Sequence, residues 1–90
     1  MNIEKITKAK YAIGSYLSQI DAMIKAKNHI MVAISHFNEV NAPLPIGADV
    51  VAFDNRHKLQ SSVDELEIQI RVANVRINNL QRVIEEEVNA

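Results

Sequence analysis

Ninety residues with a formal net charge of −1 suffice for one small domain. The absence of cysteine excludes disulfides, thiolate metal sites and cysteine nucleophiles. Apolar residues make up 48% of the chain, which excludes pervasive disorder, and the near-neutral balance is unlike that of a dedicated DNA-binding protein. No apolar run reaches the roughly 20 residues of a membrane span and no signal peptide opens the chain, so we expect a cytoplasmic protein with no membrane partner.

The first forty residues predict one long helix, over about residues 3–40, with Asn2 as its N-cap. Taking Ile6 as a heptad a position, nine of the ten a and d positions are apolar. These positions are Ile6, Ala9, Ile13, Tyr16, Ile20, Met23, Lys27, Ile30, Ile34 and Phe37. Position e adds Ile3, Leu17, Ile24 and Met31, so the apolar stripe is broader than a two-helix contact requires.

Both prolines and Gly47 fall in the stretch NAPLPIG, residues 41–47. Each proline removes a backbone donor and disfavours helical angles in the residue before it. This stretch predicts a turn over residues 41–48, near the middle of a single all-helical domain that spans residues 1–90.

The second arm repeats the pattern and predicts a helix over about residues 50–88. Its a and d positions are Arg56, Leu59, Val63, Leu66, Ile70, Ala73, Ile77, Leu80, Ile84 and Glu87. β-Branched residues at a and Leu at d suit knobs-into-holes packing. The start of this helix is open, near residue 49 or near residue 55, because Asp49 and Asp54 are both candidate N-caps. Residues 50–53 then form a turn, a separate short third helix, or the first turns of the main helix.

Charge placement favours an antiparallel hairpin, in which the two arms fold back on each other. Residues 1–40 carry a net charge of +2 and residues 41–90 a net charge of −3. Folding at the proline-rich turn pairs residues whose numbers add to about 91, because the arms are of similar length. The expected neighbours are Lys27 with Asp64, Lys25 with Glu65 and Glu67, Asp21 with Arg71, and Lys5, Lys8 and Lys10 with Glu85, Glu86 and Glu87. Facing like charges would cost energy.

The second helix carries another apolar line, Ile68, Val72 and Val75, on the face opposite its a and d positions. A two-helix hairpin leaves this line in water, which predicts either self-association or an obligate partner. We expect a coiled-coil-like homo-oligomer, with a dimeric four-helix bundle favoured. Polar residues that could accompany the contact include the seam residue Lys27, which either sets register or lays its stem along the core. The predicted interface residues are Ile68, Val72, Val75, Arg71, Asn74, Asn78 and Lys27.

The sequence contains no catalytic motif, so we expect no enzyme and no cofactor. Two spacings near the turn, His36-x-x-Glu39 and Asp54-x-x-His57, have the residue types of a zinc or iron site. Bundles that hold such metals point their ligands into the core, whereas these four residues occupy outer heptad positions. We therefore predict no metal site.

The function predicted from these features is non-enzymatic protein–protein interaction, by a small adaptor, inhibitor, chaperone or assembly subunit. The alternative is a helical oligomer that binds a small anionic ligand or nucleic acid through Lys25, Lys27 or a stripe of Arg71, Arg76 and Arg82. Nucleic acid is the less favoured partner, because acidic residues flank the arginines and no aromatic platform accompanies them.

Overall fold

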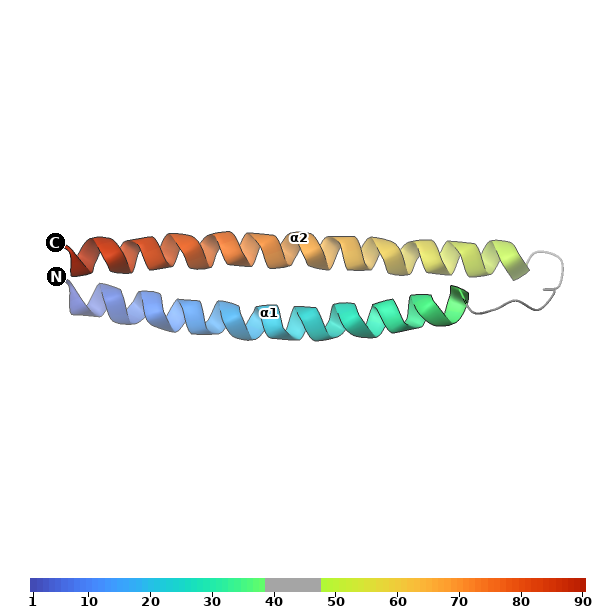
Figure 1. The fold of residues 1–90 in the computed structure, drawn as a ribbon, viewed down its shortest axis with the longest axis horizontal. Helices are drawn as coiled ribbons and strands as arrows, with labels where there is room; N and C mark the ends of the chain where they lie inside the picture. Colours follow the sequence, from blue (N-terminus) through green and yellow to red (C-terminus); the bar gives the residue numbers. More distant parts are fainter. Residues whose placement is uncertain (39–47) are drawn as a thin grey trace.

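Two long helices make up the computed structural model, which describes residues 1–38 and 48–90. Helix α1 spans Ile3–Asn38 and helix α2 spans Ala48–Val88. The helices lie side by side and run in opposite directions, so that both termini lie at the same end (Figure 1). The Cα atoms extend over 68 × 14 × 14 Å. This arrangement confirms the predicted all-α antiparallel hairpin, and the described residues contain no strand.

The start of α1 follows the predicted capping. The side-chain oxygen Oδ1 of Asn2 accepts a hydrogen bond from the backbone N–H of Lys5 at 3.1 Å. This contact satisfies one of the backbone donors that the first turn of a helix leaves unpaired. The predicted extension of this helix to residue 40 and most of the predicted turn, residues 41–47, lie outside the described residues.

Helix α2 begins at Ala48, which resolves the open question of its start. Residues 48–53 are the first turns of the main helix, and no separate third helix occurs in the described parts of the chain. This start agrees with the alternative near residue 49, whereas Asp54 lies inside the helix and is not its N-cap. The Asp54 carboxylate instead lies 3.1 Å from Nζ of Lys58, one turn further along the same helix.

The a and d positions of the two helices face each other and form the seam of the hairpin. Its most buried residues are Ala9, Val63, Ala73 and Ile77, and the remaining seam residues with described side chains are half-buried. No described side chain is completely shielded from water. Two helices can cover only one stripe of each other, so the apolar residues beyond the seam stay exposed.

Contacts between side chains of the two helices fix the register of the seam. Nζ of Lys5 lies 3.2 Å from Glu87 Oε1, and Nζ of Lys27 lies 4.0 Å from Glu67 Oε1. The guanidinium of Arg76 lies 5.8 Å from the ring centroid of Tyr16, within the range of a cation–π contact. The paired numbers add to 92–94, close to the 91 predicted from charge.

Several individual pairings differ from the prediction. Lys27 pairs with Glu67, almost one turn beyond the expected Asp64. Lys25 and Asp21 pair with each other at 2.9 Å instead of reaching across to α2. Lys8 likewise pairs with Glu4, at 3.2 Å. The reason is geometric, because residues four apart on the outer face of one helix are closer to each other than to the neighbouring helix.

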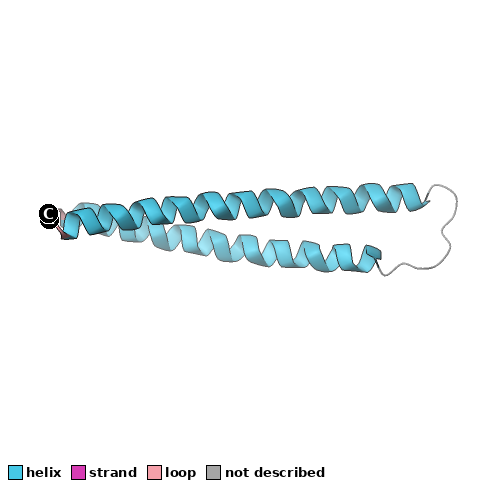
Figure 2. Ribbon diagram, turned by 45° about the horizontal axis from the view of Figure 1, so that its top comes forward, coloured by secondary structure: helices cyan, strands magenta, loops and turns pink. Residues whose placement is uncertain are grey.

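The plane of the hairpin turns along its length. In Figure 2 the two helices overlap at the end that holds the termini and lie apart at the other end of the described residues, although Figure 1 separates them throughout. Such winding is expected where apolar residues repeat every seven positions. In the part of the chain that the structure describes, neither helix has a stretch apolar enough to cross a membrane.

Candidate interaction surface

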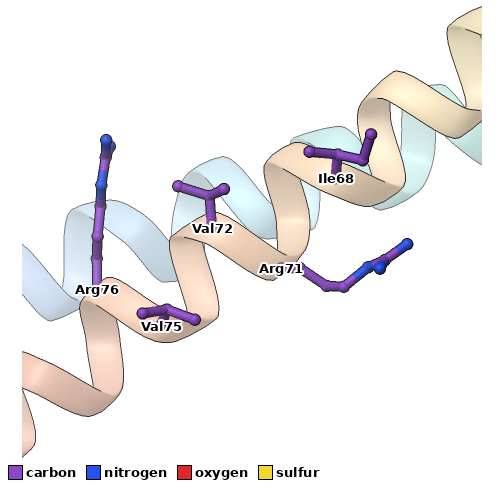
Figure 3. A pocket seen from close by; sticks show the side chains of 5 residues that line it. All are labelled: Ile68, Arg71, Val72, Val75 and Arg76. Carbon is purple, nitrogen blue, oxygen red and sulfur yellow. The ribbon is translucent and has the colours of Figure 1, made fainter.

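The main candidate surface is the apolar line on the outside of α2, formed by Ile68, Val72 and Val75 and called here the outer stripe. These side chains are 56%, 44% and 57% exposed, as expected for positions opposite the seam. With Arg71 and Arg76 they line a shallow depression on the helix surface (Figure 3). The outer stripe is therefore exposed in the single hairpin, as the sequence predicts.

The two arginines beside the outer stripe point in different directions. Figure 3 places Arg71 and Arg76 on opposite sides of the apolar residues, with their guanidinium groups directed away from each other. Residues five apart are about 140° apart around a helix, so the pair cannot form one continuous basic line. Arg76 also lies against Tyr16 of α1. The stripe of Arg71, Arg76 and Arg82 expected from sequence is therefore divided between different faces of α2.

The remaining predicted interface residues are divided between the outer surface and the seam. Asn74 and Asn78 are exposed, on the same flank of α2 as Arg71. Lys27 is a seam residue with a quarter of its side chain exposed, and its ammonium is directed to Glu67 of the same chain. The structure therefore groups Arg71 with the outer stripe and assigns Lys27 to contacts within the hairpin.

A second exposed apolar line follows α1 and was not among the predicted interface residues. Leu17, Ile24 and Met31 are 54%, 40% and 50% exposed, and we call them the α1 edge. They occupy successive e positions, seven residues apart, beside the seam. The sequence indicated this line through the excess width of the apolar stripe. The sequence alone did not show whether the second arm would cover these e positions.

A groove between the helices adjoins the outer stripe. Tyr16, Gln19 and Met23 form its α1 side, and Arg76 is among the residues that line it on α2. Its complete lining is Tyr16, Gln19, Met23, Ile68, Gln69, Val72, Ala73 and Arg76. The groove therefore extends the apolar surface of the outer stripe toward α1.

The described residues bring together no three metal-ligating side chains. His36, Asp54 and His57 are exposed, and Glu39 lies outside the described residues. Among the described residues, one carboxylate with a shifted pKa lies at the end of the hairpin that holds both termini. There the pKa of Glu87 lies below its ordinary value, first because the backbone N–H of Asn2 donates to the carboxylate, and second because Lys5 does. This arrangement is an ion pair between the ends of the two helices.

Comparisons with known proteins do not add to this description. No family model matches the chain, and neither curated proteins nor solved structures give a match. The function must therefore be inferred from the surface itself.

Proposed function

We propose that this protein is a non-enzymatic protein–protein interaction module that acts as a helical homo-oligomer, in the manner of a small adaptor, inhibitor, chaperone or assembly subunit. The observation that carries the proposal is the outer stripe. Its three large apolar side chains are adjacent on one face of α2, and each of them is strongly exposed in the hairpin. Contiguous exposed apolar surface of this kind is typical of a site that another protein covers.

The size of the chain supports the same proposal. A hairpin 14 Å across has little interior, and its most buried seam residues include two alanines, Ala9 and Ala73. The hydrophobic effect stabilises a fold roughly in proportion to the apolar area removed from water, so association would add the burial that one hairpin lacks. A second copy is the partner that is always present at the protein's own concentration.

Sedimentation of the full chain over a range of concentrations tests the proposal. We expect self-association at tens of micromolar, and loss of that association when Ile68, Val72 and Val75 are all replaced by Ser. The matched control replaces Tyr11 and Val32 by Ser, because these residues are also exposed and apolar but lie on the outside of α1. A wild-type protein that stays monomeric, or a control that dissociates equally, would contradict the proposal.

A further inference from the structure

We infer that the outer stripe of α2 is covered by the α1 edge of a second copy, with these two helices running parallel. This inference rests on the proposed self-association and adds which surfaces meet and in which direction. Three observations carry it: a pair of apolar residues seven positions apart in each line, the arginines on both sides of the outer stripe, and the position of Asp21 beside the α1 edge.

Each of the two exposed apolar lines contains a pair of residues that are seven positions apart. Ile68 and Val75 are seven residues apart, as are Leu17 and Ile24. Seven residues correspond to about 10.5 Å along a helix, so both pairs can be in contact at once. In the parallel arrangement Leu17 lies against Ile68 and Ile24 lies against Val75. Val72 then fills the turn between them.

Packing the outer stripe against another copy of itself is disfavoured by charge. Arg71 and Arg76 lie on its two sides. In an antiparallel pairing centred on the stripe, Arg71 of one copy faces Arg71 of the other. In a parallel pairing, Arg71 of one copy approaches Arg76 of the other. Because like charges that face each other across an interface reduce affinity, the complementary surface should carry a carboxylate.

Asp21 supplies that carboxylate and also sets the direction of the helices. It lies one turn after Leu17 and nearly one turn before Ile24, on the exposed flank of the α1 edge. In the parallel arrangement Asp21 is level with Arg71 and on the same flank. In the antiparallel alternative it would lie beside Val72 instead. Its present partner, Lys25, forms an exposed pair that contributes little to stability, so the carboxylate remains available to Arg71.

The proposed contact joins two different surfaces of the protein. Each copy presents its outer stripe to one neighbour and its α1 edge to another, so the contact is heterologous and can continue from copy to copy. The pairs on the flank that carries Asp21 are compatible along the whole overlap. Asn28 approaches Asn78, and Ser35 approaches Glu85, with no facing like charges.

Disulfide cross-linking tests the pairing directly, because the chain has no cysteine of its own. Chains with Leu17→Cys and chains with Ile68→Cys are mixed, oxidised mildly and measured by mass spectrometry without reduction. We expect mixed dimers in excess over those formed by Ile24→Cys with Ile68→Cys. An excess of Ile68→Cys self-dimers, an excess of the Ile24→Cys mixture, or yields no higher than with the exposed Val88→Cys control would each overturn the inference.

A charge exchange supplies an independent measurement. Asp21→Lys and Arg71→Glu should each weaken self-association about tenfold, and the double variant should recover most of the loss. Lys25→Ala is the control, since it removes the same pair within α1 and leaves Asp21 in place. If the wild type associates and the double variant shows no recovery, this inference fails while the proposed function stands. A monomeric wild type contradicts both.

Discussion

The Lys5 ammonium lies 3.2 Å from the Glu87 carboxylate and joins the first turn of α1 to the last turn of α2. The other oxygen of the same carboxylate accepts the backbone N–H of Asn2 at 3.0 Å. The Glu87 side chain thus holds together the end of the hairpin where the two termini lie, although Asn2 and Glu87 are 85 residues apart in sequence. Because the two helices are joined covalently only at the other end, this contact restrains the place where they would otherwise separate.

The first prediction concerns pH and Glu87. The hydrogen bonds from Asn2 and Lys5 lower the pKa of Glu87 below its ordinary value of 4.5. A lowered pKa in the folded state stabilises the fold at pH values above the ordinary one, and this contribution disappears as the pH falls below it. Glu87→Gln should therefore melt at a lower temperature than the wild type near neutral pH and at the same temperature in strong acid.

Thermal unfolding followed by circular dichroism at both pH values checks this expectation. Glu86→Gln is the matched control, since Glu86 is exposed and adjacent in sequence, and it should leave the melting temperature nearly unchanged. A Glu87→Gln variant that is equally destabilised at both pH values would show that its effect is not electrostatic.

The second prediction concerns the polar seam residue. Lys27 occupies a seam position at which an apolar side chain would remove more surface from water. A polar residue at such a position specifies register at a cost in stability. Lys27→Ile should therefore raise the free energy of unfolding by about 1 kcal/mol, as measured with denaturant. Lys25→Ile, on the exposed face, is the control and should change it much less. A loss of stability in Lys27→Ile would mean that the pair with Glu67 contributes more than burial does.

The sequence alone was sufficient to predict the hairpin, its antiparallel direction and its register to within a few residues. Each of these depends on many positions together, so a single misplaced pair has little effect. The seam could be predicted because apolar residues recur with the helical period. The register could be predicted because the two arms carry net charges of opposite sign.

Individual ion pairs were harder to predict. Asp21 and Lys25 pair with each other within α1. The heptad pattern does not show whether a charged residue pairs within its own helix or with the other helix. The start of α2 stayed open between residues 49 and 55, because both Asp49 and Asp54 suit an N-cap by residue type. The α1 edge became an interface candidate only when the structure left Leu17, Ile24 and Met31 uncovered.

The third prediction separates the seam from the outer stripe. Ile77 is 6% exposed, whereas Val75, two residues earlier, is on the opposite face of α2. Ile77→Ala should lower the free energy of unfolding by about 2–4 kcal/mol, because it removes buried methyl groups and leaves a cavity. Val75→Ala should change it by less than about 0.5 kcal/mol in dilute protein and should weaken self-association instead. Denaturant unfolding and sedimentation of the same two variants distinguish these roles, and a large loss of stability in dilute Val75→Ala would place Val75 in the hairpin core.

The fourth prediction concerns Gly14, which lies inside α1 on its outer surface. Apart from its chain neighbours and the adjacent backbone of α1, an added Cβ atom at this position would meet no atom within 4 Å, so the glycine is not required by a close approach within the described hairpin. Glycine in a helix interior costs up to about 1 kcal/mol relative to alanine, because it loses more backbone freedom on folding. Gly14→Ala should therefore raise the free energy of unfolding of dilute protein by roughly that amount. The reverse change at another exposed position, Ala22→Gly, should lower it by a similar amount. Destabilisation by Gly14→Ala would show that α1 bends or packs at this residue in a way that the isolated hairpin does not require.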